Sequence, residues 1–346
     1  MAVPLPPVPV RRYVLGPALL VLLVLGALAL PLLVVVAAVV SAFLPGRWRA
    51  LRLLLLALVY LALEVVGLVV AAVLWVAAGF GRRLDQPRWQ AAHHTVLRRL
   101  VVAVVAVARR LFRLEVADHD VSWSPLDDGQ PGSERAMVVL ARHAGAGDSF
   151  LLVRTLMNRD HLRRPRIVLK AALQWDPLVD VYLNRIPSTF VDAGGDEVVR
   201  AIGDLAAGMG DEDALLIFPE GGNFTAARRE RALASLRAKG WTERAALAEQ
   251  MTEVLPPRTA GVVAALQAAP HADVVLVAHT GLEHLSTPRD LWRGLPDDKC
   301  LLLRWWFHEA ADVPREADAL SAWLWERWGE VDDWVRAHAG GERRAG

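Results

Sequence analysis

The chain has 346 residues, of which 54% are apolar, and carries a formal net charge of +1. Such an apolar composition excludes an ordinary soluble domain along the whole chain, and the near-zero charge does not point to nucleic-acid binding. A single cysteine, Cys300, excludes an internal disulfide framework and a cysteine metal cluster.

Most of the apolar residues lie at the start of the chain. After a basic tail at residues 1–13, residues 14–44 carry no charge, and residues 53–80 form a second apolar run that is broken only by Glu64. Each run exceeds the ~20 residues that span a bilayer, and the first is longer than the roughly 7–15 apolar residues of a signal peptide. We therefore predict a membrane hairpin of two hydrophobic helices over residues 14–80.

The sequence is compatible with two membrane topologies. Both outer flanks are basic and the short connector carries Arg47, Arg49 and Arg52, so the positive-inside rule barely separates two full passes from a shallow hairpin in one leaflet. Pro31 would break the first run into two half-helices. A charge such as Glu64 is costly in hydrocarbon, which makes it a candidate functional residue by default. The alternative, which we favour, is that Glu64 is protonated or paired with a neighbouring helix. Either topology predicts a protein of the cell membrane, with its large domain on the cytoplasmic face.

Residues 81–113 combine an apolar centre with basic ends. Arg98-Arg99 and Arg109-Arg110 lie on either side of a Leu-Val-Val-Ala-Val-Val stretch. This pattern favours an interfacial helix that holds a domain against anionic headgroups. A helix buried in the domain and a third membrane segment are the alternatives.

From residue 114 onward the composition is that of a globular domain. Short β-type runs alternate with helix-like segments, which predicts an α/β fold with a mixed, mostly parallel sheet flanked by helices. We expect this domain to cover residues 114–338 and to be followed by a flexible tail at residues 339–346. The predicted strands are 114–116, 136–141, 167–169, 214–218, 274–278 and 301–305, and the predicted helices are 149–158, 197–208, 225–239 and 258–268.

A histidine and a carboxylate follow the predicted strand at residues 136–141. His143 and Asp148 stand five positions apart, at the kind of strand end where α/β sheets present their sites. A neutral imidazole can remove the proton of an attacking hydroxyl near pH 7, and a carboxylate on its other ring nitrogen fixes the tautomer. We therefore interpret His143 as a candidate general base that Asp148 orients.

Other candidate binding residues lie further along the chain. Glu220 and Gly221 end an apolar strand just before a predicted helix, where backbone amides favour an anionic group; the alternative is a plain turn with a helix cap. Lys170, Arg185 and Arg258 flank apolar segments. Each is a candidate phosphate contact or an ordinary surface charge.

The motifs occur in a characteristic order. They are His143-x4-Asp148, Lys170-x2-Leu173-x3-Pro177, Thr189-Phe-Val-Asp192 and Phe218-Pro-Glu-Gly221, followed by Phe224-Thr225, Arg228-Arg229 and Leu255-Pro-Pro-Arg-Thr-Ala-Gly261. In order and spacing the set resembles the lysophosphatidic acid and glycerolphosphate acyltransferase family. The later motifs resemble most closely the branch that contains eukaryotic-type lysophospholipid acyltransferases. The resemblance extends over residues 95–335.

The resemblance implies a membrane-bound O-acyltransferase. An acyl chain would pass from acyl-CoA or acyl carrier protein directly to the hydroxyl of a lysophospholipid, most often 1-acylglycerol-3-phosphate, in phospholipid biosynthesis or remodelling. His143 would be the general base and Asp148 would orient it. No metal and no cofactor beyond the acyl donor are implied, and the expected partners are membrane lipids, the acceptor and the donor. The residues implied to bind the acceptor are Glu220, Gly221, Lys170, Arg185 and Arg258.

Three positions depart from the family pattern. Ala193 stands where the second motif commonly ends in Arg, and Gly222-Asn223 stands where Thr-Arg often follows the Glu-Gly pair. Arg142 precedes His143 where Asn is frequent. Two phosphate-binding arginines are thus displaced, or the acceptor is another lysophospholipid or a glycolipid. The candidate substitutes are Arg185, Arg228 and Arg258.

Two other functions are less well supported. Gly147-Asp-Ser149-Phe150 resembles the nucleophile block of GDSL-type lipases, but those hydrolases also need an Asp three residues before a His, and no histidine in this chain has one. A non-catalytic membrane protein that has kept the fold is the second alternative, which the altered motifs permit.

Overall fold

The computed structural model describes residues 5–44, 48–118, 135–145, 147–157, 163–191, 195–281, 292 and 300–338. The chain forms two compact units. The first comprises Met1–Leu114, Leu169–Ala193 and Leu295–Asp297, and the second comprises Glu115–Val168, Gly194–Gly294 and Asp298–Gly346. The predicted boundary at residue 114 lies at this division, whereas residues 169–193 group with the first unit. The predicted tail at residues 339–346 lies outside the described residues.

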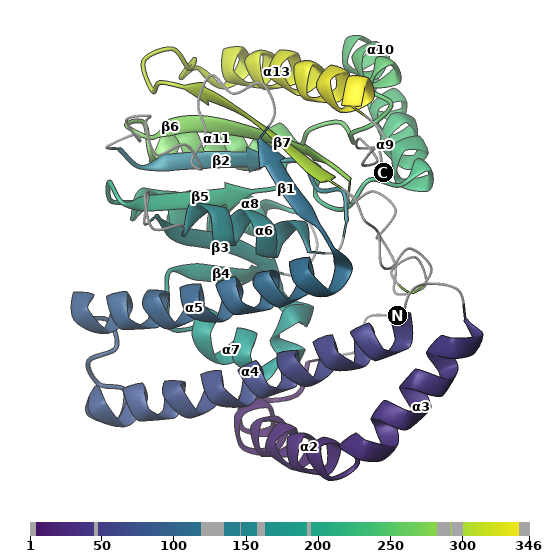
Figure 1. The fold of residues 1–346 in the computed structure, drawn as a ribbon. Coiled ribbons are helices and arrows are strands. Elements are labelled where there is room, and N and C mark those ends of the chain that lie inside the picture. The colour runs from purple at the N-terminus through teal and green to yellow at the C-terminus, as the bar shows by residue number, and fades with distance from the viewer. Residues whose placement is uncertain are drawn as a thin grey trace. The chain divides into compact units, whose positions relative to one another are not determined.

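The first apolar run forms two helices. A short turn, α1 (Val8–Val10), and a π-helical turn (Arg11–Leu15) lead into α2 (Gly16–Leu28), and α3 (Leu30–Phe43) follows after Ala29 (Figure 1). Pro31 lies in the first turn of α3, where its missing N–H and its ring interrupt a continuous helix. The predicted break at Pro31 is confirmed.

The second apolar run is a single helix, α4 (Arg49–Ala77). Among the residues that the structure describes, two helical segments are suited by length and composition to cross a membrane: Val8–Leu28, with 21 residues, and α4, with 29. One face of α4 carries the buried residues Glu64, Gly67 and Ala71. Gly67 lies against α7 (Pro177–Leu183), where a Cβ would come within 2.4 Å of Leu178 Cδ1. This face therefore needs a residue without a side chain to pack within the first unit.

The basic segment predicted at residues 81–113 is α5 (Pro87–Phe112). It carries buried residues, of which Leu100 packs in the first unit with Ala71 and Tyr182, and Arg109 and Arg110 lie in its last turn. The burial supports a helix packed in the protein at these residues. Membrane contact of its exposed residues stays a prediction.

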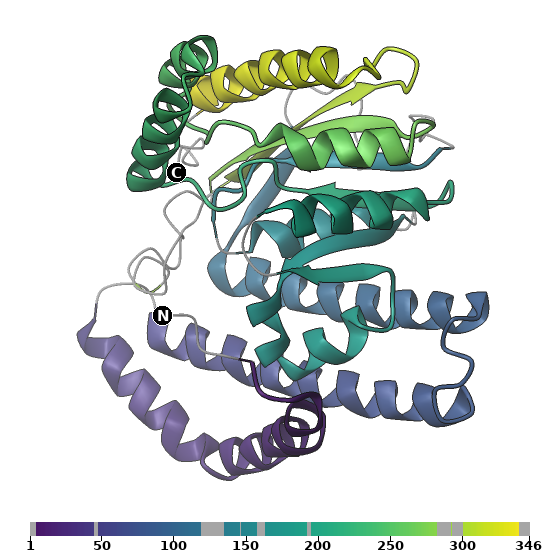
Figure 2. The same ribbon diagram turned by 180° about the vertical axis from the view of Figure 1, so that it is seen from behind.

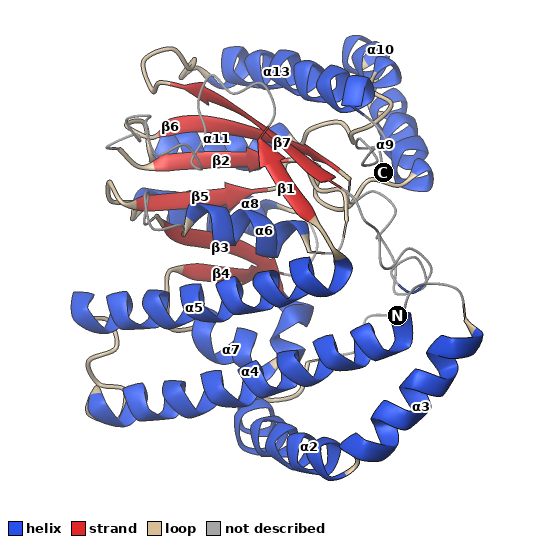
Figure 3. Ribbon diagram, in the orientation of Figure 1, coloured by secondary structure: helices blue, strands red, loops and turns tan. Residues whose placement is uncertain are grey.

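In the described part of the chain the sheet has seven strands, in the order β1-β7-β6-β2-β5-β3-β4 (Figure 3). The pairing of β6 with β7 is antiparallel, and β2 with β5, β2 with β6, β3 with β5 and β1 with β7 are parallel. The predicted mixed, mostly parallel sheet is confirmed. The strands are β1 (Glu115–Asp118), β2 (Met137–Ala141), β3 (Arg164–Lys170), β4 (Ser188–Val191), β5 (Asp213–Ile217), β6 (Asp273–Thr280) and β7 (Cys300–His308).

Helices cover both faces of the sheet in the second unit. In Figure 1, α6 lies in front of the sheet, and in the reversed view of Figure 2, α8 and α11 lie in front. These helices satisfy the need of a buried parallel sheet for cover on each face. The helices of this unit within the described residues are α6 (Asp148–Leu156), α8 (Asp196–Ala207), α9 (Ala226–Ala238), α10 (Thr242–Gln250), α11 (Thr259–Ala268) and α13 (Ala317–His338).

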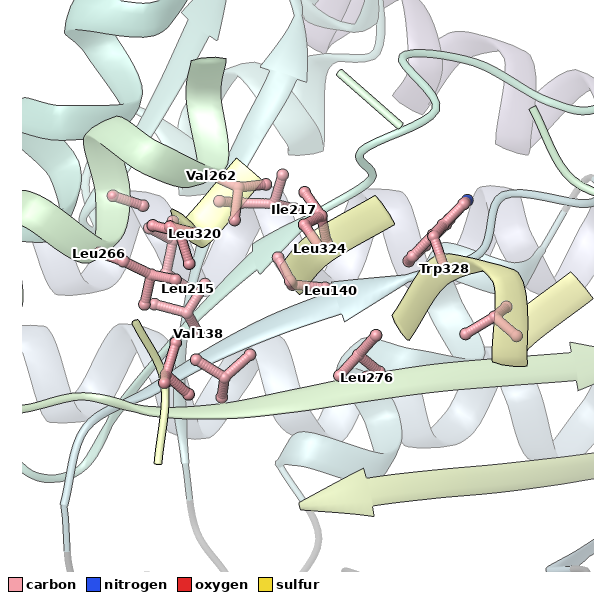
Figure 4. Packing of buried hydrophobic residues seen from close by; sticks show 14 of the residues in the cluster. Val138, Leu140, Leu215, Ile217, Val262, Leu266, Leu276, Leu320, Leu324 and Trp328 are labelled. Carbon is pink, nitrogen blue, oxygen red and sulfur yellow. The ribbon is translucent and has the colours of Figure 1, made fainter. Parts of the chain in front are cut away.

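The main core lies between the sheet, α11 and α13. Alternate residues of a strand point to the same face, so Val138 and Leu140 of β2 share that core with Leu215 and Ile217 of β5 (Figure 4). The core packs β2 firmly from one side, and the strand is buried along its whole length. Val262 and Leu266 of α11 and Leu320, Leu324 and Trp328 of α13 complete this layer.

Candidate active site

His143 lies just beyond the carboxyl end of β2. The strand ends at Ala141, and the backbone amide of Arg142 still donates to the carbonyl of Val277 on β6, at 3.0 Å. The chain then leaves the sheet and enters α6 at Asp148. Gly147 precedes that helix with φ +98°, a left-handed conformation that favours glycine. The short loop returns the chain so that the side chains of His143 and Asp148 meet.

The two side chains form a directed hydrogen bond. Asp148 Oδ2 lies 2.7 Å from His143 Nδ1, and the side chains of Asp148 and His143 are 1% and 21% exposed. An ionised carboxylate can only accept, so Nδ1 carries the proton and Nε2 keeps a lone pair. The imidazole is therefore held in the tautomer that can take a proton at Nε2, on the side away from Asp148.

Asp148 is held as an anion by several donors. Its Oδ2 accepts from the amides of Ala144 and Gly145, at 3.1 and 3.3 Å, and its Oδ1 accepts from the amide of Ser149, at 2.6 Å. Burial acts to raise the pKa of Asp148, but the hydrogen bond from His143 and the nearby charge of His279 bring that pKa below its ordinary value. The carboxylate is thus ionised throughout the pH range in which a histidine works as a base.

Two buried residues beside this pair were not assigned a role from the sequence. His279 lies near the end of β6, and its Nε2 donates to the carbonyl of Arg142 at 3.0 Å. The Arg142 guanidinium donates in return to the carbonyls of His279, at 2.6 Å, and Glu253, at 3.0 Å. The departure from the family pattern at Arg142 was the only indication in the sequence that either residue is part of the site. It did not reveal these long-range partners.

Glu220, three residues after the end of β5, contacts the same loop. Its Oε1 accepts from the backbone amide of His143, at 2.8 Å, and its Oε2 accepts from the amide of Leu255, at 2.9 Å. The residue is 3% exposed, and burial raises the pKa of Glu220 to about 7, against the lowering effect of these two hydrogen bonds. The observed contacts position the main chain around His143. A direct contact between Glu220 and the acceptor stays a prediction.

The rest of the segment at residues 218–224 folds around His143. The ring of Phe218 lies against the imidazole, with centroids 4.5 Å apart. The amide of Phe224 donates to the carbonyl of His143 at 3.0 Å. Gly221 and Gly222, between these contacts, therefore lie next to the candidate base.

Two guanidinium groups lie over this glycine pair. A Cβ on Gly221 would come within 2.9 Å of Arg258 Cζ, and a Cβ on Gly222 within 2.8 Å of Arg228 Nη1. Arg258 is exposed, and its backbone amide donates to the carbonyl of Pro219 at 2.9 Å. The structure thus brings Gly221 and Arg258 together, as predicted for two binding residues, and adds Arg228. Their role in binding stays a prediction.

Comparison with known proteins decides the family. Residues 124–280 match the family model described as Acyltransferase. These residues are a domain of the acyltransferase family. It is the family of lysophosphatidic acid and glycerolphosphate acyltransferases, so the predicted resemblance is confirmed and the domain supports acyl transfer in lipid metabolism. No curated protein and no solved structure matches the chain.

Two of the predicted binding residues lie in the first unit. Lys170 ends β3 and is exposed. Arg185 donates from Nη1 to the carbonyl of Ala71 at 2.7 Å and lies 3.4 Å from His93 Nε2. Burial lowers the pKa of Arg185. The Arg185 guanidinium therefore has a structural contact of its own, and phosphate binding by Arg185 or Lys170 stays a prediction.

Metal ligation has no candidate in the described part of the acyltransferase. Within residues 5–338, apart from the gaps given above, no three His, Cys, Asp or Glu residues are grouped so that they could hold a metal ion. The prediction of a reaction without metal or cofactor is not tested by this.

Proposed function

We propose that this acyltransferase is a membrane-bound enzyme that esterifies the hydroxyl of a lysophospholipid with an acyl chain from acyl-CoA or acyl carrier protein. The observation that carries the proposal is the 2.7 Å contact between His143 Nδ1 and Asp148 Oδ2 within the acyltransferase domain. The buried carboxylate and the partly exposed imidazole suit a base that meets its substrate at Nε2.

The reaction follows from this geometry. His143 Nε2 takes the proton of the acceptor hydroxyl as the oxygen attacks the thioester carbonyl carbon, which gives a tetrahedral intermediate and an imidazolium. Asp148 stabilises the imidazolium without itself taking the proton. The intermediate collapses, the carbon–sulfur bond breaks, and the thiolate receives the proton from His143. The products are the ester and the free thiol, and no acyl-enzyme forms.

The acceptor most consistent with the site is 1-acylglycerol-3-phosphate. Arg258 and Arg228 lie over Gly221 and Gly222, beside the loop that holds His143. Guanidinium groups bind phosphate through paired N–H donors, so these two arginines supply a phosphate contact that Ala193 and Asn223 lack. Another lysophospholipid or a glycolipid is the alternative acceptor.

The N-terminal helices support attachment to the cell membrane. The break at Pro31 divides the first run into α2 and α3, with 13 and 14 residues. Val8–Leu28 is nevertheless helical over 21 residues, about 31 Å, and α4 over 29 residues, about 44 Å, against a hydrocarbon core of about 30 Å. These lengths allow two full passes, and the break at Pro31 allows a shallow hairpin. The topology can be tested with a variant in which Cys300, the single natural cysteine, is replaced by Ala and Trp48, between α3 and α4, is replaced by Cys. Labelling of that cysteine by an impermeant maleimide on intact cells would establish two passes.

The activity is tested with purified full-length protein. Mass spectrometry follows acylation of a panel of lysophospholipids with several acyl-CoAs and with acyl carrier protein. We expect one donor–acceptor pair to turn over and His143→Ala to lower kcat by ~10²–10⁴, the usual contribution of a positioned base. His271→Ala removes an exposed histidine and is the matched control. Equal rates for the wild type and His143→Ala would refute His143 as the base, and the absence of any product would refute the activity.

A further inference from the structure

The turn at residues 253–255 is held by side chains from outside its own segment. It has no helical or strand hydrogen bonds, yet the amides of Glu253 and Val254 both donate to Asp332 Oδ1 of α13, at 2.6 and 3.0 Å. Trp328, one turn earlier on α13, donates from Nε1 to the carbonyl of Leu255 at 3.1 Å. Helix α13 thus fixes this turn at both of its ends.

The same turn is bonded to the residues around the candidate base. The amide of Leu255 donates to Glu220 Oε2, and Glu220 Oε1 accepts from the amide of His143. The carbonyl of Glu253 accepts from the guanidinium of Arg142. Two hydrogen-bonded routes therefore run from the turn to the main chain at residues 142–143, where β2 ends.

All the side chains in these routes are buried. Asp332 is 1% exposed, and Trp328, Arg142 and Glu220 are also buried. Hydrogen bonds in such a low-dielectric setting are strong, and groups left unpaired there are costly, so the turn has one preferred position. Arg336, one turn after Asp332, is hydrogen-bonded to its second oxygen and balances its charge.

We propose that Asp332 and Trp328 of α13 are positioning residues for His143. They hold the turn at residues 253–255, and the turn holds the His143 amide through Glu220. Catalysis depends on such placement, since a misplacement of about 1 Å by a distant substitution can lower the rate by about 10²-fold. Both residues lie beyond residues 124–280, which the family model covers. The proposal rests on the function proposed above.

The first test compares kcat of Asp332→Ala, Asp332→Asn and Leu320→Ala well below their melting temperatures. Asn keeps an acceptor oxygen for the two amides, and its NH₂ group displaces only the half-exposed Arg336 from the second position. We therefore expect Asp332→Asn to retain kcat and Asp332→Ala to lose about 10- to 100-fold. Leu320 is a fully buried core residue of the same helix with no bond to the turn. Leu320→Ala lowers the melting temperature by cavity formation and should leave kcat unchanged. An equal loss of kcat in Leu320→Ala and Asp332→Ala would overturn the proposal in favour of general destabilisation.

The second test measures the coupling with Glu220. If Asp332 acts on His143 through Glu220, the loss of kcat caused by Asp332→Ala should be smaller in a Glu220→Gln background, because that link is already weakened. If the fold-loss of kcat in the double variant equals the product of the fold-losses in the two single variants, the route through Glu220 is refuted.

A third measurement does not depend on turnover. Amide hydrogen exchange of the peptide that contains His143 should be faster in Asp332→Ala than in the wild type, and unchanged in Asp332→Asn and Leu320→Ala. Exchange unchanged in Asp332→Ala would overturn the proposal. If the wild type acylates no lysophospholipid, the proposed function fails, and the exchange result alone still decides whether α13 positions residue 143.

Discussion

Arg142 and His279 each donate a side-chain hydrogen bond to the backbone carbonyl of the other, at 2.6 and 3.0 Å. These two hydrogen bonds join the end of β2 to the end of β6, just before His143. Because both residues are buried, these hydrogen bonds are shielded from water and hold the two strand ends together.

Arg142→Ala should destabilise the protein. It removes charged donors from the carbonyls of His279 and Glu253, each worth about 1.5–3 kcal/mol, so we expect the free energy of unfolding to fall by roughly 3 kcal/mol or more. Chemical denaturation gives the value. Arg237→Ala, which removes an exposed ion pair with Glu249, serves as the control and should change stability by less than about 1 kcal/mol. Equal stability of the two variants would contradict this account.

Asp148→Asn should abolish most activity without unfolding the site. Both carboxylate oxygens accept from N–H donors, so either orientation of the Asn amide places its NH₂ group against a donor. An NH₂ group facing His143 Nδ1 moves the ring proton to Nε2, and the base is lost. We expect kcat to fall by ~10²–10⁴.

Steady-state acylation assays across the active pH range measure the effect of Asp148→Asn. Asp204→Asn, at an exposed position of α8, is the matched control. Wild-type kcat in Asp148→Asn would show that the carboxylate does not orient the base.

Glu220 should make stability depend on pH. Burial raises its pKa from the ordinary 4.5 to about 7, so between these values the folded protein binds a proton that the unfolded chain has released. The free energy of unfolding then falls as pH rises through this window. The contribution is present in full below the unfolded pKa and is lost as pH rises through the folded pKa, a change on the order of 3 kcal/mol.

Glu220→Gln removes this titration. Denaturant unfolding at a series of pH values should show the wild type losing stability relative to Glu220→Gln between pH 4.5 and about pH 7, with no further relative change above that window. Glu243→Gln, which removes an exposed carboxylate, should track the wild type. A difference between Glu220→Gln and the wild type that does not vary with pH would disprove the raised pKa.

The two arginines over Gly221 and Gly222 should select acceptors that carry phosphate. Arg258→Ala and Arg228→Ala each remove a charged donor, worth about 1.5–3 kcal/mol when bonded to phosphate. We therefore expect KM for 1-acylglycerol-3-phosphate to rise about tenfold or more, with little change in KM for a neutral monoacylglycerol.

A variant without loss of charge tests the same arrangement. Gly222→Ala places a methyl group 2.8 Å from Arg228 Nη1, so the guanidinium must move and KM for the phosphate-bearing acceptor should rise. Arg237→Ala, on the same helix as Arg228, is the charge-matched control for Arg228→Ala. If KM rises equally for the phosphate-bearing and the neutral acceptor in the Arg228, Arg258 and Gly222 variants, a phosphate contact is ruled out.

Local pattern was enough to predict much of the sheet. Short apolar runs bounded by turn residues placed β2, β5 and β6, because a buried parallel strand is apolar along its length. The short, half-buried β4 and the short helices α7 and α10 were not predicted, since their sequences have no comparable run. Helix α13 was also not predicted, although Leu320, Leu324, Trp328, Val331 and Val335 recur at the helical spacing that would have indicated it.

The site was predictable only where its residues are neighbours in sequence. The spacing of His143 and Asp148 allowed their pairing to be expected, and the structure places them in contact. The bonds of Glu220 to His143 and Leu255, and of Arg142 to His279, join residues 35 to 137 positions apart. Such contacts depend on strand pairing, which no local pattern encodes.

The bonds from α13 to the turn at residues 253–255 have a practical consequence for expression. A fragment that ends at residue 281 would contain every motif by which the family is recognised, yet it would lack Trp328 and Asp332 and would expose the face of the core that α13 covers. We expect such a truncated domain to be insoluble or inactive. A minimal soluble catalytic unit, whether for crystallisation or for engineering, must therefore retain the chain through residue 335.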